Sequence, residues 1–399
     1  MNGKTKCGGR AAGRRETAEF VLPGHPDKLC DAVADNFVAI AAAGDDFAQC
    51  GIEVACVFDR VFVTGRLATG SLESNFLIKA SLAEIVRAAY RSAGYGPDAA
   101  GHAWGPAPES LDVDFALCAG LFDRDERALR HLSDDQAICV GYALRSPETD
   151  YLPPAHWLAR RIGRELARLR RERGAGQVGP DGKVIVHGRR AGRGGAFRPE
   201  LVSVSLNHHE RSDWLLLRGI VEEAVETACA GMAPPDVEVN GAGMFVAGGP
   251  NGDNGLSGKK LVVDAYGPGV PIGGGAWSGK DFMKVDRLGG MAARRLALES
   301  LLASGADEAQ VTLAYLPGGD RPARVDLLLD GRPSDRVVIP PAFGALESRV
   351  LHALFVPAAA GAVDLARWGH QRPGMPWELP NAAPVRAIAN LAPIAGALL

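Results

Sequence analysis

The densest glycine block of this chain lies between Gly241 and Gly290, and it restricts what can be built there. Glycine adopts positive φ angles and lets a ligand approach the backbone closely, and successive backbone N–H groups in such loops bind anions. Lysine and aspartate are interspersed in two runs, GGPNGDNGLSGKK at 248–260 and GGGAWSGKD at 273–281. Neither run has the GxxxxGK(S/T) spacing of a Walker loop. The block predicts either an anion site built from loops or a mobile surface.

A shorter motif, Gly24-His25-Pro26-Asp27-Lys28, precedes a helix that we expect from about Leu29. The motif places an imidazole, a carboxylate and an ammonium group where the helix dipole and free N–H groups favour anions. The alternative is that Asp27 is only a helix N-cap and His25 only a turn residue. Because both glycine-rich runs also pair cations with aspartate, the three segments together favour the anion-site interpretation of each over that of a mobile surface.

The rest of the chain has the pattern of an α/β fold in the wide sense (α+β), with mixed sheets covered by helices on one side. A strand, a turn and a strand are expected over Ile52–Val63, and further strands at Val184–Val186, Leu201–Leu206, Val237–Val239, Met244–Val246, Val311–Tyr315 and Arg324–Leu329. Helices are expected at Asn75–Ala93 and Trp214–Ala230, from Arg294, and from about Pro341.

One further expected helix is amphipathic, with Leu158, Ile162, Leu166 and Leu169 on one face and the arginines of Arg160–Arg173 on the other. We interpret that arginine run as a solvated helix face rather than a phosphate site.

The length of 399 residues suffices for two or three domains with a sizeable core. The formal net charge of -3 argues against a nucleic-acid or anionic-membrane partner. No apolar run approaches the roughly 20 residues of a membrane span. Residues 1–15 are basic and glycine-rich, which predicts a disordered tail. The default expectation for location is the cytoplasm.

Several motifs occur in the order in which S-adenosylmethionine synthetases carry them, from about Glu19 to about Glu378. They are GHPDK, GGPxGDxGLxGKK, VDxYG, GGGAxSGKDxxKVDR, the segment Asp135–Ala143, and the shorter matches at Pro180–Lys183, Trp368–His370 and Pro376–Glu378. The chain therefore resembles this family over nearly its whole length.

The resemblance implies three similar α/β domains that are related by pseudo-threefold symmetry and woven from discontinuous segments. The approximate boundaries are 16–24 plus 145–247 for an N-terminal-type domain, 25–117 plus 248–287 for a central domain, and 118–144 plus 288–399 for a C-terminal-type domain. It also implies a homodimer with shared active sites, usually paired into a homotetramer. The implied enzyme joins ATP to L-methionine and then hydrolyses the bound triphosphate to pyrophosphate and phosphate.

Such a reaction needs no general base, because a thioether sulfur carries no proton; its barrier lies in expelling a highly charged triphosphate. Catalysis then depends on positioning and on preorganised positive charge. The candidate residues for this charge are His25, Lys183, Lys259, Lys260 and Lys280, with Lys284 nearer the amino acid.

By the resemblance, His25 contacts the triphosphate near the breaking C5′–O bond. Asp27 and Asp286 hold Mg²⁺, which prefers oxygen ligands, and Glu53 corresponds to the glutamate of a K⁺ site. The other implied contacts of ATP or the second substrate are Glu19, Asp135, Asp181, Phe245 (stacked on adenine), Asp253 and Ala276.

The chain departs from the family on the amino-acid side of the reaction. Arg66 stands where the family holds the amino acid with a glutamate, and an arginine favours a carboxylate or another anion instead. The segment from Gly120 to Glu126 lacks the family's GKQSPDI-type gating motif, whereas Asp253 and Lys284 are retained.

Three hypotheses follow. The first is a methionine adenosyltransferase whose gating loop and local charges have co-varied. The second is an adenosyltransferase with a different acceptor, such as a methionine analogue with an extra carboxylate for Arg66. The third is a non-catalytic ATP-binding subunit.

Overall fold

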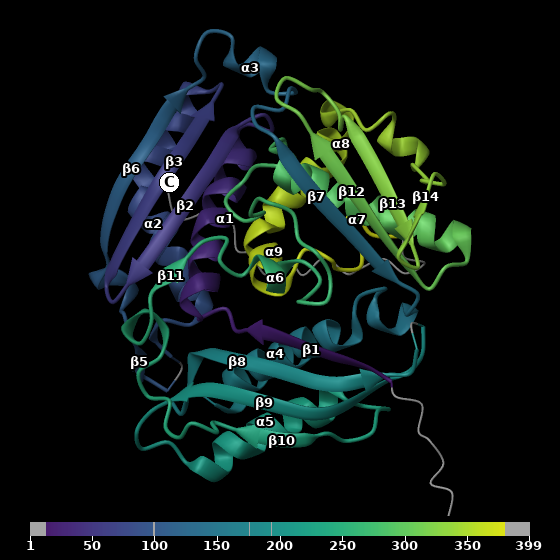
Figure 1. Cartoon of the computed structure of the whole chain (residues 1–399). Coiled ribbons are helices and arrows are strands. Elements are labelled where there is room, and N and C mark those ends of the chain that lie inside the picture. Colours follow the sequence, from purple (N-terminus) through teal and green to yellow (C-terminus); the bar gives the residue numbers. More distant parts are fainter. Residues whose placement is uncertain (1–12, 99, 175, 193, 380–399) are drawn as a thin grey trace, which may run out of the picture.

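The computed structural model describes residues 13–98, 100–174, 176–192 and 194–379, except for the side chains of 72–80. Figure 1 shows three four-stranded sheets at the periphery, around a centre that holds α1 (Pro26–Gly44), α6 (Leu261–Asp264) and α9 (Ala362–Trp368). Three clusters of buried apolar side chains form the core, one against each sheet. The expected α/β class is confirmed.

The first sheet has the order β1 (Arg14–Val21), β8 (Val178–Arg190), β9 (Phe197–His208), β10 (Asp236–Val239). Its pairs are antiparallel except for the parallel β9–β10 pair. The helices α4 (Pro154–Arg173) and α5 (Trp214–Ala228) pack on it. Arg14 and Arg15 were expected in a disordered tail, but they pair with β8 as the start of β1; the rest of that tail, residues 1–12, lies outside the described residues.

The second sheet repeats this pattern with β11 (Gly255–Leu256), β2 (Gln49–Val57), β3 (Arg60–Thr69) and β6 (Asp112–Leu121), of which β3 and β6 are parallel. It packs on α1 and α2 (Leu72–Ala93). The strand, turn and strand expected over Ile52–Val63 are confirmed, and both strands are longer than expected. The side chains of β2 alternate between buried and more exposed positions, so one face of the sheet meets the core and the other stays open.

The third sheet is antiparallel throughout, in the order β14 (Arg332–Ser334), β13 (Arg324–Leu329), β12 (Glu308–Tyr315), β7 (Ala137–Leu144). The helix α7 (Val285–Ser304) lies on it, and α8 (Ser348–Phe355) packs against α7. Two short strands, β4 (Gly96–Pro97) and β5 (Ala103–Trp104), form a separate ribbon, and α3 (Glu126–Leu129) follows β6.

Each large sheet joins strands that are distant in the sequence, since β1 pairs with β8 and β7 with β12. We infer that each sheet with its helices is one of three domains. The boundary expected after residue 117 falls inside β6, which continues to Leu121.

Some element predictions are wrong. The helix expected from about Pro341 begins only at Ser348, after a 3₁₀ turn at Pro341–Phe343. Met244–Val246 is not a strand: the Phe245 carbonyl accepts one backbone bond from the His208 N–H and the Val246 carbonyl accepts one from the Gly248 N–H, and the segment's other bonds are to side chains. The carbonyls of Phe245 and Val246 accept from Asn207, and the Phe245 N–H donates to the His208 ring. The helix expected from Arg294 begins at Val285. Its glycines suggested a loop, but Gly290 instead lets Trp277 pack closely, because a Cβ there would lie 2.7 Å from the indole Nε1.

The stretch Ser348–Trp368 is long and apolar enough to cross a membrane by length and composition alone, which the sequence analysis did not recognise. In the fold it is divided into α8, a 3₁₀ segment (Val356–Gly361) and α9. Leu351, Phe355 and Leu365 are 0% exposed, so one face of the stretch packs into the core, and 39% of its apolar window is buried.

Candidate active site

His25 and Asp27 stand at the N-terminus of α1, where the helix has unpaired backbone N–H groups. His25 is the N-cap, because its Nδ1 accepts a hydrogen bond from the N–H of Asp27 at 3.2 Å. Pro26 starts the helix, earlier than the expected Leu29. Burial lowers the pKa of His25 to about 3, and the charge of Lys183 acts in the same direction. The imidazole is therefore neutral at physiological pH.

The first glycine-rich run brings two lysines to Asp27. Lys260 Nζ donates to Oδ2 at 2.7 Å, and Lys259 Nζ lies 3.6 Å from Oδ1. Burial opposes ionisation of Asp27, but the hydrogen bonds from Lys260 and from the Leu256 N–H outweigh it and lower the pKa of the carboxyl. Gly255 allows this approach, because a Cβ there would lie 2.4 Å from the carbonyl oxygen of Pro26.

Asp181 ties the same run to β8. Its Oδ2 accepts from the Gly249 N–H at 2.8 Å, and its Oδ1 is buried without a hydrogen-bond partner among the described residues. Burial raises the pKa of Asp181 to about 6. Lys183 is exposed on the outer face of β8, and Asp253 is exposed within the run. Burial has the largest effect on the pKa of His25; after it, the charge of Lys183 lowers this pKa and the charge of Asp253 raises it. Lys183 and Asp253 therefore both lie near His25.

The second glycine-rich run makes a separate pair at the N-terminus of α7. Lys280 Nζ lies 2.5 Å from Oδ2 of Asp286, a residue of the first helical turn. Gly275 packs against the same carboxylate, because a Cβ there would lie 2.1 Å from Asp286 Oδ1. Lys284 forms an ion pair with Asp134, a partner that the sequence analysis did not identify.

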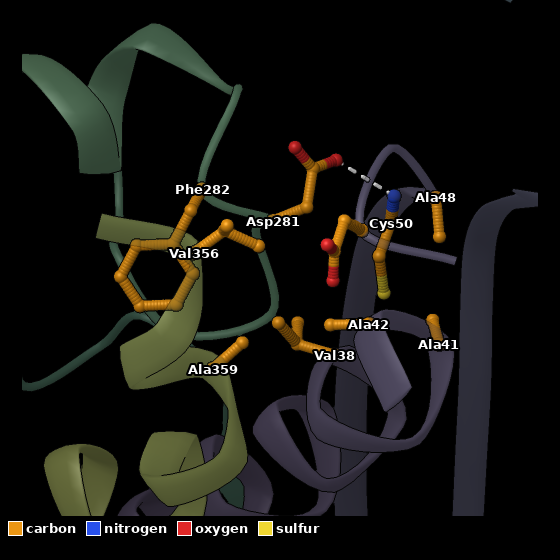
Figure 2. A pocket seen from close by; sticks show the side chains of 10 residues that line it. Val38, Ala41, Ala42, Ala48, Cys50, Asp281, Phe282, Val356 and Ala359 are labelled. Atoms are coloured by element: carbon orange, nitrogen blue, oxygen red, sulfur yellow. Dashed lines mark hydrogen bonds between the residues drawn. The ribbon is translucent and has the colours of Figure 1, made fainter. Parts of the chain in front are cut away.

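Asp281 holds the loop that carries both of these lysines. Figure 2 shows its carboxylate beside Cys50 of β2, next to a small pocket lined by apolar residues such as Phe282 and Val356. Oδ2 accepts from the Cys50 N–H at 2.7 Å, and Oδ1 accepts from Arg130 Nη2 at 2.7 Å. The arrangement fixes Lys280 and Lys284 relative to the second sheet.

A network of buried charged residues lies next to the Lys260–Asp27 and Lys280–Asp286 pairs and holds their backbone in place. Arg287 is 0% exposed and donates to both carboxylate oxygens of Asp35 at 2.8 and 2.9 Å, and its Nη1 also donates to the Lys280 carbonyl at 2.8 Å. Lys28 pairs with Asp31 and Asp264. Sequence reasoning missed this network, although Lys28, Asp31 and Asp35 recur at the spacing of one helix face.

On the amino-acid side, Arg66 is already paired. Its Nη2 lies 2.6 Å from Glu126 Oε2 and 3.8 Å from Asp123 Oδ2. Arg66 of β3 pairs with Gly51 of β2, and a Cβ added to Gly51 would lie 3.9 Å from Cε of Lys284. Arg66 and Lys284 are therefore near each other. The two features in which the chain departs from the family, Arg66 and the segment that ends at Glu126, are thus in direct contact.

The other expected residues lie at the margin of these clusters. Glu19 on β1 and Glu53 on β2 are exposed, and Phe245 is half-buried. Asp135 is exposed, and its carboxylate accepts from the Gln136 N–H at 2.8 Å. Ala276 lies next to Gly258, because a Cβ added to Gly258 would lie 2.7 Å from the Cβ of Ala276. No ion pair within the described part of the chain joins Glu19 or Glu53 to the lysines.

The carboxylates fit a metal that arrives with a phosphate ligand. No group of three or more His, Cys, Asp or Glu side chains that could hold a metal is found among the described residues. Mg²⁺ in nucleotide sites is usually held by one or two carboxylates together with substrate phosphates. Asp27 and Asp286 are such carboxylates, and each lies beside a lysine that could pair with a phosphate instead.

Comparison with known proteins agrees with this arrangement. Sequence models of the N-terminal, central and C-terminal domains of S-adenosylmethionine synthetase match residues 14–107, 131–245 and 247–335. An S-adenosylmethionine synthase of Methylobacterium sp. (strain 4-46) is 36% identical over 79% of this chain and 80% of its own length. One of Leifsonia xyli subsp. xyli is 30% identical over 94% of this chain and 98% of its own. The chain belongs to the S-adenosylmethionine synthetase family.

Proposed function

We propose that this protein transfers the adenosyl group of ATP to the sulfur of L-methionine, forming S-adenosylmethionine, and then hydrolyses the triphosphate to pyrophosphate and phosphate. The observation that carries the proposal is the pairing of Lys260 with Asp27 and of Lys280 with Asp286, each at a helix N-terminus. With Mg²⁺ on each aspartate, the two lysines would be free to pair with the triphosphate, and together with family membership this accounts for the charge that a leaving triphosphate requires.

The residues act by positioning and by charge. His25 is neutral, so it can donate a hydrogen bond to the oxygen that leaves the 5′-carbon without holding the product as a fixed cation would. Lys183, Lys259, Lys260 and Lys280 stabilise the negative charge that develops on the triphosphate. Phe245, Asp135, Asp181, Ala276 and Glu19 are the proposed contacts of the nucleoside and its surroundings.

The metal ions are part of the proposal. Asp27 and Asp286 would hold Mg²⁺, which when bound neutralises phosphate oxygens and orients them. Glu53, exposed on β2 opposite Thr64, is the proposed K⁺ ligand.

Methionine is the acceptor that the geometry favours. The carboxylate of Glu126 neutralises Arg66, so Arg66 does not need a carboxylate from a different acceptor. Asp253 and Lys284 are both present for the amino acid. The full set of cations also weakens the hypothesis of a non-catalytic ATP-binding subunit.

A shared active site is the second part of the proposal. Lys183, Glu53 and Arg66 lie on the open faces of the first two sheets, and so do exposed apolar residues such as Phe62 and Ile185. Exposed apolar surface of this kind marks an interface. We therefore expect a homodimer in which a partner closes each site, paired into a homotetramer, and located in the cytoplasm, where ATP and methionine are available.

The test uses purified protein with ATP, Mg²⁺ and K⁺, with and without methionine, and with a panel of methionine analogues. S-adenosylmethionine detected by mass spectrometry, with matching phosphate release, supports the proposal. A product from an analogue but not from methionine would assign another acceptor. ATP binding without any adenosyl product would overturn both assignments.

A further inference from the structure

A second cationic site lies between α4 and the segment that follows α9. Arg160, Arg161 and Arg164 of α4 line it from one side and Arg372 lines it from the other, around a pocket of about 210 Å³ that is open to solvent. None of the residues proposed above for adenosyl transfer lines this pocket.

The four guanidinium groups of this pocket have no carboxylate partner. None of them lies within the 4.0 Å of an ion pair with any carboxylate in the described part of the chain. Asp150, the one acidic residue in the lining, accepts from the indole Nε1 of Trp157 at 3.0 Å. The lining therefore carries an excess of positive charge.

Burial makes this excess costly. Arg160 is 5% exposed, and its Nη1 has no hydrogen-bond partner among the described residues. Gln371 is also buried, at 2% exposed, and its side chain lies beside the Tyr266 hydroxyl. Neither its amide oxygen nor its amide nitrogen makes a hydrogen bond of ordinary geometry among the described residues. Burial, followed by the charge of Arg164, lowers the pKa of Arg160 to about 9. A buried donor without a partner costs about 1–3 kcal/mol.

The interpretation of this run as a solvated helix face is thus wrong for Arg160. The helix packs its leucines inward as predicted, but Arg160 turns toward Gly369 after α9. A Cβ on Gly369 would lie 2.3 Å from Arg160 Nη1, so the glycine makes room for the guanidinium. Arg164 stands at the mouth of the pocket, where partial loss of water, followed by the charge of Arg372, lowers its pKa to about 10.

We propose that this pocket binds a polyphosphate anion, either free pyrophosphate or the phosphate chain of a nucleotide. The lining holds four guanidiniums and one carboxylate, and Asp364 and Glu378 lie farther off as the other negative charges that act on these arginines. The remaining excess favours a ligand with several negative charges over a single carboxylate. The planar fork of arginine donates two hydrogen bonds to phosphate oxygens at once. An anion in the pocket neutralises charge that the chain itself leaves unpaired.

The pocket is connected to the catalytic loop through few contacts. Gln371 and Arg372 follow His370, whose Nε2 lies 3.0 Å from Nη2 of Arg287, and Arg287 holds the Lys280 carbonyl. Pyrophosphate is also a product of the proposed reaction. The idea that the enzyme's own reaction supplies the pyrophosphate rests on the proposed function. The binding of a polyphosphate anion to the pocket does not.

The test is calorimetric titration of pyrophosphate, and separately of ADP, into the full-length protein and three variants. Arg160→Gln/Arg164→Gln removes half of the guanidinium groups. Arg372→Gln removes charge from the opposite wall and serves if the double variant fails to fold. Arg168→Gln is the matched control on the same helix, because Arg168 is already paired with Glu165 and Glu172.

The expected result is that Arg160→Gln/Arg164→Gln and Arg372→Gln each weaken one class of pyrophosphate site at least about tenfold, a factor worth 1.4 kcal/mol. Arg168→Gln should bind as the wild type does, and S-adenosylmethionine formation should continue in all three. Tighter binding of ADP than of pyrophosphate would assign the nucleotide as the ligand; the reverse would assign the free anion. Unchanged affinity and stoichiometry in folded pocket variants would overturn the proposal, even if the enzyme makes S-adenosylmethionine.

Discussion

Arg66 and Glu126 form an ion pair, with Nη2 2.6 Å from Oε2 and Nε 3.4 Å from Oε1. Burial opposes ionisation of Glu126, but the hydrogen bond from Arg66 outweighs it and lowers the pKa of the carboxyl. The pair joins β3 to the segment that replaces the family's gating motif. We infer that these two departures compensate each other, so the acceptor site need not present a free cation.

Glu126→Gln should therefore raise the KM for methionine about tenfold, or by about 1.4 kcal/mol, because Arg66 would keep only the exposed Asp123, 3.8 Å away, and its excess charge would repel the substrate's ammonium group. The value of kcat should change little. Steady-state kinetics check this, with Arg66→Gln/Glu126→Gln as the control that removes both charges and should restore the KM. An unchanged KM in the single variant would contradict the compensation.

Lys280→Ala should lower kcat about 10²–10³-fold, the usual cost of removing one preorganised donor from a transition state. Lys280 faces Asp286 and is the cation proposed for the leaving triphosphate. Lys280→Arg keeps the charge and should retain part of the rate. The measurement is single-turnover adenosyl transfer, with melting temperatures to confirm the fold; full activity in Lys280→Ala would remove this residue from the mechanism.

Gly275→Ala should impair catalysis, and Gly274→Ala should not. A Cβ on Gly275 would lie 2.1 Å from Asp286 Oδ1, whereas nothing lies within 4 Å of one on Gly274. A displacement of about 1 Å in a positioned group can cost about 100-fold in rate. Parallel kcat measurements on these adjacent variants separate a specific clash from a general effect on the loop. Equal rates would show that the carboxylate tolerates displacement.

His156 should make the protein sensitive to acid. Burial lowers the pKa of His156 to about 3 from an ordinary 6.5, and the charge of Arg160 adds to this effect. Between these values the unfolded chain binds a proton that the native state does not, so stability is lost as the pH falls from 6.5 toward 3.

The free energy of unfolding of the wild type should therefore fall with decreasing pH more steeply than that of His156→Leu, by about 1.4 kcal/mol per pH unit. Urea titrations at several pH values between 6.5 and 4 measure both slopes. Parallel slopes would mean that His156 gains a proton in the native state as readily as in the unfolded chain.

Local patterns predicted much of the fold. The turn expected within Ile52–Val63 located the β2–β3 hairpin, and the leucines of α4 marked its buried face correctly. The signal for the start of α1 was also present, since proline is favoured at the first position of a helix. The expectation of Leu29 overlooked Pro26.

The sequence could not show contacts between distant residues. Glu126 lies 60 residues from Arg66, and Asp134 lies 150 residues from Lys284, so no local spacing indicates either pair. Arg160 fits the polar face of a helix by its spacing, and only the close approach of Gly369 explains its burial. These positions are set by tertiary packing, which overrides local preference.

In the proposed reaction, triphosphate is displaced from the 5′-carbon of ATP. It is tested most directly with ATP that carries ¹⁸O in the bridge between C5′ and the α-phosphorus. Cleavage of the C5′–O bond predicts that all of the label leaves with the triphosphate and appears in pyrophosphate or phosphate, with S-adenosylmethionine formed in equal amount. Label retained on the nucleoside would show cleavage at phosphorus and would contradict the account.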